Sequence, residues 1–362
     1  MNIAIVGAGP IGSYAAYQLS KQGFNVHLFD QKPKKELGKP IQCTGLLTSE
    51  IKKFIPLNKN FLINTFSHVE VFSPTGKKIK INKTEYLVDR IKFDQHLLNL
   101  AIDQGTTFYP KHKLISITSN YQLIFKHKKK ENVISPDIII GADGPSSLIT
   151  KHLNPLLLKR DYYVGFQATI KGNFNPTTYQ TLFNNNLAPE LFAWLVPESS
   201  TMARIGLATR KRPAHYFTKL LAHLSISPKN IIEKQAGTIP IYTPNLITKQ
   251  DNIYLLGDAA GHVKATTLGG IIPGFKAAIN LTHKLTNRQP PFHISKNLNL
   301  HLKIRTILNK FSNQDYHKLI NLISKPKIKK LLSTHSRESP KKLLQKIFLK
   351  EPRFLRFLKK LF

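Results

Sequence analysis

The sequence predicts an α/β protein with an inserted antiparallel sheet and a helical C-terminal tail. In residues 2–30 and 253–285, apolar runs pass through glycine-rich turns into helical stretches, as in parallel βαβ units. Residues 161–245 read instead as strands separated by turn residues, with one short helix. From residue 291 the chain is helical and basic.

These observations predict a discontinuous first domain, interrupted by the antiparallel sheet. The expected ranges are 1–160 and 246–290 for the first domain, 161–245 for the sheet, and 291–362 for the C-terminal region. A chain of 362 residues is long enough for this number of linked parts.

The composition indicates the cellular compartment and argues against disulfides, metal sites and membrane spans. Cys43 is the single cysteine, so no internal disulfide is expected and a reducing cytoplasm is favoured. Clustered Cys and His ligands are absent, and we expect no metal site. No apolar run approaches the roughly 18 residues that span a bilayer. Because the first strand begins at residue 2, we also expect no signal peptide.

The net charge of +34 is the unusual property of this chain. Residues 301–362 contain 17 basic and 3 acidic residues, a local net charge of +14. Such a surface attracts polyanions, although a general lysine bias is an equal explanation. No nucleic-acid motif accompanies the charge, so we do not expect nucleic acid as a partner.

A glycine motif follows the first apolar run. Gly7, Gly9 and Gly12 have the spacing G-x-G-x-x-G, with a strand before and a helix after. The first glycine permits the turn, the second lets the backbone approach a pyrophosphate, and the third packs the helix on the strand. Asp30 ends the next strand, where a carboxylate binds ribose hydroxyls. The segment predicts a Rossmann-like dinucleotide site.

Two later segments share this pattern of a strand ending in small residues and a carboxylate. They are GADG at residues 141–144 and GDAAG at residues 257–261. Asp258 could bind a ribityl or ribose hydroxyl, and the helix beginning near Gly269–Ile271 offers a positive end to an anion. The order of the three motifs is typical of proteins that bind FAD across the whole chain.

The chain resembles FAD-dependent oxidoreductases of the aromatic-hydroxylase type, and within them the geranylgeranyl reductases, including the archaeal digeranylgeranylglycerophospholipid reductases. The resemblance rests on IQCTGLL, YLVDRIKFDQHLLNLA, FAWLVP and GDAAGHVKATTLGGI, and it runs from Met1 to about Asn287. It implies reduction of C=C bonds in geranylgeranyl chains of membrane lipids or their precursors. In this sequence Phe192 replaces a tyrosine, Val196 an aromatic residue and Leu268 a frequent glycine of that family.

The resemblance also implies which residues hold the cofactor and the substrate. The FAD residues would be Gly7, Gly9, Gly12, Asp30, Cys43, Thr44, Gly45, Arg90, Leu114, Asp258, Gly270 and Ile271. Phe192, Trp194 and His262 would face the substrate.

Each assignment has a structural alternative. Cys43 can be a small buried hydrophobic residue, Arg90 can bridge to Asp94, and Trp194 can be plain core. His262 and its neighbour Lys264 can be solvated or support a helix.

The implied reaction adds a hydride from reduced FAD and a proton to an unactivated alkene, with Cys43, or a water it orders, as the candidate proton source. The electron donor is expected to be a ferredoxin-like protein or NADPH. Two other functions fit the FAD framework. One is a flavin monooxygenase acting on an aromatic or polyene substrate, and the other is a non-catalytic FAD-binding sensor or scaffold at a membrane surface.

The end of the chain predicts an amphipathic, basic surface. In residues 339–350, Leu343, Leu344, Ile347 and Phe348 share a face. Beyond Pro352, Phe354, Leu355, Leu358, Leu361 and Phe362 share another. This pattern suits an anionic membrane surface, and we expect a cytoplasmic protein that associates peripherally with it. The alternative is a helix pair that packs on the body of the protein.

Overall fold

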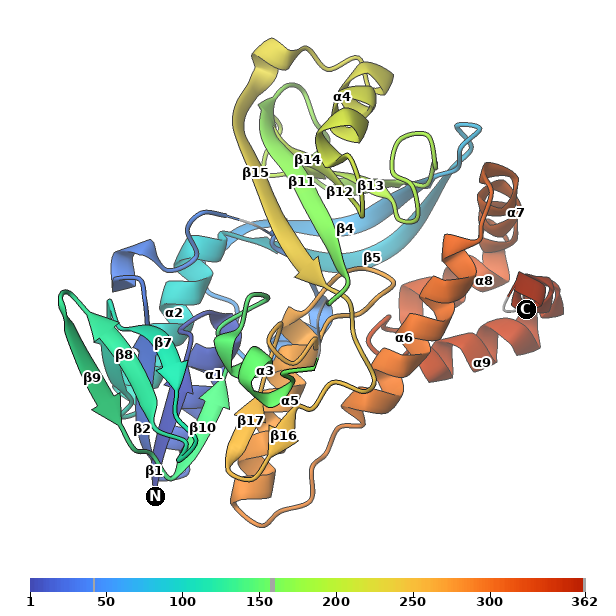
Figure 1. Cartoon of the computed structure of the whole chain (residues 1–362). Coiled ribbons are helices and arrows are strands. Elements are labelled where there is room, and N and C mark those ends of the chain that lie inside the picture. Colours follow the sequence, from blue (N-terminus) through green and yellow to red (C-terminus); the bar gives the residue numbers. More distant parts are fainter. Residues whose placement is uncertain (42, 157–159, 361–362) are drawn as a thin grey trace. The chain divides into compact units, whose positions relative to one another are not determined.

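The computed structural model describes residues 1–41, 43–156 and 160–360. Gln42 of the IQCTGLL segment, and Leu361 and Phe362 of the tail, lie outside the described residues. The chain divides into two compact units, each discontinuous in sequence (Figure 1). Unit 1 contains residues 1–40, 90–161 and 239–298, and unit 2 contains residues 41–89, 162–238 and 299–362.

This division differs from the expected ranges in several segments. Residues 239–245 and 291–298 belong to unit 1, and residues 299–362 belong to unit 2 instead of forming a part of their own. The largest difference lies near the N-terminus. Residues 41–89 belong to unit 2 and not to the dinucleotide-binding part. The reason is the long hairpin of β4 (Leu62–Phe72) and β5 (Lys78–Val88). Its strand β4 pairs in parallel with β12 (Thr178–Leu182), so the hairpin extends the sheet of unit 2. Strand-like alternation in the sequence could not show which sheet the hairpin joins.

Unit 1 is built on a six-stranded sheet in the order β16-β17-β10-β1-β2-β6. The strands are β1 (Asn2–Val6), β2 (Asn25–Asp30), β6 (Thr107–Pro110), β10 (Ile138–Gly141), β16 (Lys249–Gln250) and β17 (Ile253–Leu255). All neighbours pair in parallel except β16 and β17. The central strand β1 is buried from Ile3 to Val6, as expected of a parallel strand covered on both faces.

Helices and a small sheet cover this parallel sheet. The helices of unit 1 are α1 (Pro10–Ser20), α2 (Arg90–Asp103), α3 (Leu148–Leu153) and α5 (Ile271–Leu285), and α1 packs against both α2 and α5. The meander of β7 (Lys113–Ile117), β8 (Leu123–His127) and β9 (Lys130–Ile134) shares a core with the sheet. In that core Leu114 and Phe125 pack with Val6 and Phe29.

Unit 2 is built on an eight-stranded sheet in the order β15-β11-β14-β13-β12-β4-β5-β3. The further strands are β3 (Leu46–Thr48), β11 (Tyr162–Lys171), β13 (Ala193–Pro197), β14 (Met202–Thr209) and β15 (Ile231–Pro240). One face packs under α4 (Pro213–His223) through residues such as Ile205 and Leu207. The opposite face packs under α7 (Asn313–Ile323) and α8 (Pro326–Thr334).

The C-terminal region is helical, as the sequence predicts. After α6 (Ile294–Asn309), the helices α7 and α8 are followed by α9 (Pro340–Lys350) and a 3₁₀ helix at Pro352–Lys360 (Figure 1). Ile347, Phe354 and Phe357 are buried in one apolar cluster with α7 and α8. The packing alternative therefore describes these side chains. Leu349 and Leu355 stay 82% and 46% exposed.

Candidate functional site

The glycine motif forms a tight strand–turn–helix junction in unit 1. Gly7 has a φ of +101°, and a Cβ there would lie 2.4 Å from the carbonyl oxygen of Ala142. A Cβ on Gly12 would lie 1.8 Å from the carbonyl oxygen of Gly7. A Cβ on Gly9 would meet nothing within 4 Å. Two glycines thus close the turn, and the third leaves open space at the N-terminus of α1. A pyrophosphate bound there stays a prediction.

Asp30 holds this turn through its carboxylate. Its Oδ2 accepts a hydrogen bond from the Ala8 backbone at 2.7 Å, and its Oδ1 accepts one from the Lys32 backbone at 2.8 Å. Burial raises the pKa of Asp30 above its usual range, against the effect of these two bonds. A carboxylate oxygen accepts more than one hydrogen bond, so both oxygens can still receive ribose hydroxyls.

The glycine segment that begins at Gly257 packs against the N-terminal glycine motif through the side chain of Ile11. Ile11, in the first turn of α1, fills the space that a Cβ on Gly257 or Gly274 would need, at 3.0 and 2.4 Å. Gly257 belongs to the GDAAG segment and Gly274 to the first turn of α5. The two ends of the predicted dinucleotide pattern, about 250 residues apart in sequence, are therefore neighbours in unit 1.

Asp258 lies among positive groups at this junction. Burial raises its pKa, while the charges of Arg90 and Arg160 act in the opposite direction. Arg160 donates to the backbone oxygens of Asp258 and Ala259 at 3.1 and 3.2 Å. Gly270 caps α5, and a Cβ there would lie 3.1 Å from Asp258 Oδ1. Asp258 and Gly270 are thus neighbours, and Ile271 follows Gly270 as the first residue of α5. Their contact with a flavin stays a prediction.

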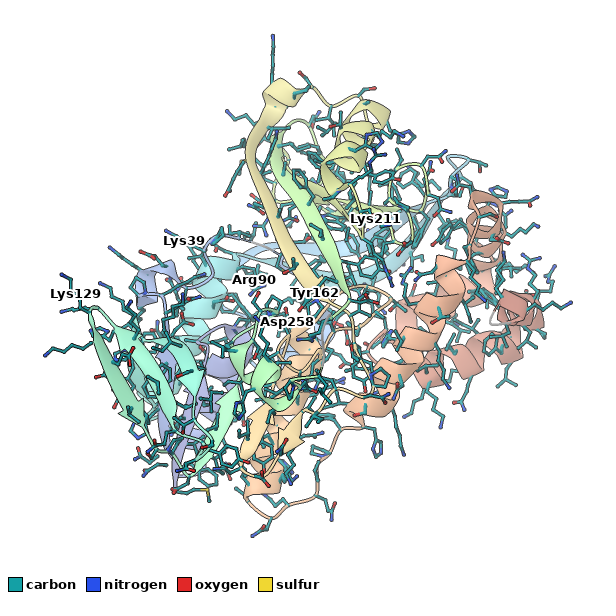
Figure 2. The ribbon with its side chains drawn as sticks, in the orientation of Figure 1. Lys39, Arg90, Lys129, Tyr162, Lys211 and Asp258 are labelled. Atoms are coloured by element: carbon teal, nitrogen blue, oxygen red, sulfur yellow. The ribbon has the colours of Figure 1, made fainter. Side chains whose placement is uncertain are left out.

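Arg90 also makes the contact that the structural alternative describes. Its Nε and Nη2 donate to the two carboxylate oxygens of Asp94, both at 3.0 Å (Figure 2 labels Arg90 and Asp258). The guanidinium is thus oriented by Asp94 while its charge acts on Asp258. Contact with a cofactor stays a prediction for this residue.

Leu114 and His262 occupy different surroundings within unit 1. Leu114 is buried in the core shared by the meander and the sheet. His262 follows the GDAAG segment, and its Nδ1 is buried without a hydrogen-bond partner. Burial lowers the pKa of His262 to about 4, so its ring is neutral at neutral pH. The neighbouring Lys264 is buried, with its Nζ about 3.5 Å from where a Gly269 Cβ would lie.

Leu268, which stands in place of a frequent glycine of the resembling family, has an unusual backbone conformation. Its φ is +56°, a left-handed conformation that glycine adopts without strain. A glycine would adopt this conformation without strain, whereas this chain holds a leucine in it.

Cys43, Thr44 and Gly45 lie in unit 2, in the loop before β3. Gly45 has a φ of +80°, and a Cβ there would lie 2.4 Å from the Val88 carbonyl oxygen. Its backbone N–H donates to Cys43 Sγ at 3.4 Å. The Cys43 thiol is partly exposed, which disfavours the alternative of an inert buried residue.

Phe192 and Trp194 flank the start of β13 in the same unit. Their rings meet edge to face, with centroids 6.4 Å apart. Trp194 packs on the core beneath α7 and α8, and its Nε1 is buried without a hydrogen-bond partner. Both the core role and the substrate role are therefore open to it.

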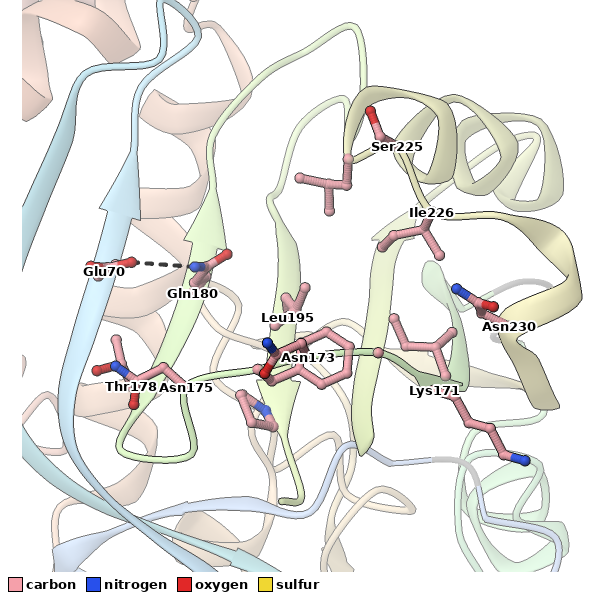
Figure 3. A pocket seen from close by; sticks show the side chains of 15 residues that line it. Glu70, Lys171, Asn173, Asn175, Thr178, Gln180, Leu195, Ser225, Ile226 and Asn230 are labelled. Carbon is pink, nitrogen blue, oxygen red and sulfur yellow. Dashed lines mark hydrogen bonds between the residues drawn. The ribbon is translucent and has the colours of Figure 1, made fainter. Parts of the chain in front are cut away.

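A cavity of about 430 Å³ lies on the other face of this sheet (Figure 3). Ile170, Leu195 and Ile226 line it, and Gln180 donates to Glu70 at 3.2 Å beside them. The cavity is distinct from the predicted site, because none of the predicted site residues lines it.

Sequence reasoning missed Arg160, Gln167 and Arg204. Arg160 gave no signal, since it lies in an ordinary basic stretch. Arg204 had one: it interrupts the apolar segment MARIGLAT, which forms β14 and is buried from residue 203 to 209. A charged residue in such a strand needs a partner.

The described residues contain neither a metal-binding cluster nor a membrane-spanning helix. Across residues 1–41, 43–156 and 160–360, no three His, Cys, Asp or Glu side chains gather so as to hold a metal ion. None of the helices in these ranges combines the length and the apolar character that crossing a bilayer requires.

Comparison with known proteins places this geometry in context. Residues 5–35 match the NAD(P)-binding Rossmann-like domain. The chain is 27% identical to the digeranylgeranylglycerophospholipid reductase of Methanocaldococcus jannaschii, over 99% of this chain and 98% of the relative. It is 29% identical to the reductase of the same name from Methanococcus vannielii, over 75% and 73%. The predicted resemblance to these reductases is confirmed.

The solved structures agree on the fold. A geranylgeranyl bacteriochlorophyll reductase-like protein from Thermoplasma acidophilum covers 100% of this chain and 99% of its own, with a TM-score of 0.81 and 21% identity. The flavin-dependent halogenase CmlS covers 99% and 78%, with a TM-score of 0.67 and 13% identity. The reductase-like protein and the halogenase thus share one architecture with this chain, and the fold alone does not separate their reactions.

Proposed function

We propose that this chain is an FAD-dependent reductase of the C=C bonds in geranylgeranyl chains of membrane lipids or their precursors. The observation that carries the proposal is the packing of the Ile11 side chain against Gly257 and Gly274. It joins the predicted pyrophosphate end and the predicted flavin end in a chain related over 99% of its length to a reductase of such lipids.

The chain's own residues would hold the cofactor at several points. The open backbone at Gly9 and the N-terminus of α1 would bind the pyrophosphate, and Asp30 the adenosine ribose. Asp258, Gly270 and Ile271 would meet the flavin end, with the positive end of α5 facing the anionic edge of the ring. Reduced FAD would supply a hydride there.

A residue of unit 2 would supply the proton that the alkene requires. An isolated alkene is not electrophilic, so a proton must arrive with the hydride or before it. Cys43, or a water that it orders, is the proposed source, and Trp194 and Phe192 would form an apolar wall for the isoprenoid. A Cys43→Ala variant should lose turnover and keep its flavin. Normal turnover in that variant would refute the role of the thiol.

The reaction and its alternative can be tested together. The purified chain is expected to show a flavin spectrum and, when reduced anaerobically with a geranylgeranyl lipid present, to add two hydrogens per double bond. Mass spectrometry of the lipid measures this gain. Oxygen consumption with an oxygenated product would instead favour the monooxygenase alternative. Parallel reactions with reduced ferredoxin and with NADPH would identify the electron donor.

We also propose that the basic C-terminal region touches an anionic membrane surface. The buried Ile347, Phe354 and Phe357 cannot insert, but the exposed Leu349 and Leu355 lie among lysines and arginines. Binding of the protein to vesicles with and without anionic lipid should separate the contribution of electrostatic attraction from that of leucine insertion. Changing both leucines to serine should weaken binding by about tenfold or more. Equal binding to neutral vesicles would contradict the proposal.

A further inference from the structure

Three residues form a row across the sheet of unit 2. In the register of β11, β14 and β13, Gly206 lies directly opposite both Gln167 and Trp194. Directly opposed residues share one face of a sheet. A Cβ on Gly206 would lie 2.5 Å from Gln167 Cβ and 2.7 Å from Trp194 Cζ2. Gly206 therefore leaves the room in which these two side chains approach each other.

Gln167 connects this row to the loop that contains Cys43. The Thr44 hydroxyl donates to Gln167 Oε1 at 2.9 Å, and Gln167 Nε2 donates to Gln235 Oε1 at 2.6 Å. Gln235 in turn donates to Glu233 at 3.1 Å. Because Gln167 is only 4% exposed, its amide orientation is fixed by these partners and not by solvent.

Arg204 holds the same loop at a second point. It lies two residues from Gly206 on β14, and so on the same face. Its Nη1 donates to the Thr44 carbonyl oxygen at 2.5 Å, and its Nε donates to Glu198 at 2.6 Å. Thr44, between Cys43 and Gly45, is thus bound through both its hydroxyl and its carbonyl group.

A buried network of this kind needs an explanation other than stability. Arg204 and Glu198 side chains are 5% and 13% exposed, and removing such charges from water offsets most of their attraction. Apolar residues would pack this face at least as well. What the network supplies is a fixed direction for a short loop that has no regular secondary structure of its own.

We propose that Gln167 and Arg204 are positioning residues that fix the Cys43–Gly45 loop to the strand row containing Trp194. They thereby set where the thiol stands relative to the apolar wall. The inference rests on the proposed function for its catalytic meaning, but the positioning itself can be measured without cofactor or substrate.

Alkylation of Cys43 provides that measurement, since the chain has one cysteine and any label reports this loop alone. Thr44→Val removes the hydroxyl at constant shape, and Gln167→Leu removes its acceptor. Both should raise the rate of reaction with iodoacetamide by about fivefold, the factor expected for one hydrogen bond. Thr44→Ser restores the donor and should keep the parent rate.

Thr181→Val is the matched control. Thr181 lies opposite Trp194 on β12, in the same row, but its hydroxyl bonds to the Glu70 backbone and not to the loop. It should alkylate at the parent rate. The proposal is overturned if Thr44→Val changes the rate by less than about twofold, or if Thr181→Val accelerates it equally.

The two failures are distinguishable. A parent protein without flavin would refute the proposed function and leave the alkylation result intact. A flavin-containing parent whose Thr44 variants react normally would refute only the positioning role. Melting temperatures of all variants, measured alongside, separate a released loop from general loosening, because Thr44→Ser and Thr44→Val should differ in rate while melting alike.

Discussion

The two loops predicted to contact FAD near residues 7–12 and 43–45 are fixed by different means. In unit 1, the Gly7–Gly12 turn is held by close backbone packing, where a Cβ would collide with carbonyl oxygens. In unit 2, the Cys43–Gly45 loop is held by side chains of distant strands, Gln167 and Arg204. The first arrangement relies on backbone atoms, those of Gly7 itself and of Ala142 on a distant segment. The second relies on side chains more than 120 positions away. Steric and polar anchoring should therefore fail in different ways.

Substitutions in the glycine turn should separate its folding role from its binding role. Gly12→Ala places a Cβ 1.8 Å from the Gly7 carbonyl oxygen and should lower the free energy of unfolding by about 3 kcal/mol or more. Gly9→Ala meets no protein atom within 4 Å and should cost at most about 1 kcal/mol. Denaturant unfolding measures both. Gly9→Ala should nevertheless lose flavin, and normal flavin content in it would contradict the proposed pyrophosphate site.

Polar anchoring should fail through an unpaired charge. Arg204→Met leaves Glu198 buried without its guanidinium partner and should cost about 2–3 kcal/mol. Adding Glu198→Gln should recover part of that loss, because the uncompensated charge is removed. A double variant no more stable than Arg204→Met would show that the cost comes from packing and not from charge.

The pH dependence of stability tests a third kind of buried group, one without a polar anchor. His262 of unit 1 is such a group, because its Nδ1 is buried without a hydrogen-bond partner. Burial lowers its pKa from 6.5 to about 4, so the unfolded chain takes up the proton first as the pH falls. Stability should therefore be complete above pH 6.5 and decline towards pH 4, by about 2 kcal/mol for a partly exposed ring. His262→Gln should flatten this part of the profile, and an unchanged slope would assign the decline to other groups.

The smallest effect concerns Leu268, the residue with a positive φ in the late glycine segment. Leu268→Gly and Leu268→Ala both remove the side chain, but only glycine relieves the left-handed strain. The glycine variant should be more stable than the alanine variant by about 1 kcal/mol. Thermal unfolding of the pair measures this difference, and equal stabilities would mean that the backbone rearranges around residue 268.

Features set by spacing along the chain were predictable from the sequence, and features set by tertiary pairing were not. The glycine turn, Asp30 and the cluster of Asp258 and Gly270 were predictable, because spacing along the chain determines their conformation. The expected helices near 91–104 and 213–224 are present as α2 and α4. The placement of residues 41–89 was not predictable, because it depends on the pairing of β4 with β12. Arg160 and Gln167 were missed for the same reason: their partners are set by tertiary structure.

The packing of Ile11 against Gly257 and Gly274 has a consequence for synthesis of the chain on the ribosome. The central strand β1 emerges first, but its neighbour β10 ends at residue 141 and the glycines that receive Ile11 come after residue 256. At about 5–20 residues per second, the first motif waits on the order of 10–50 s for its partners. Until β10 has emerged, the apolar strand β1 lacks one of its two neighbours, and Ile11 lacks its glycines for the whole interval. We therefore expect the nascent N-terminus to be a client for a chaperone.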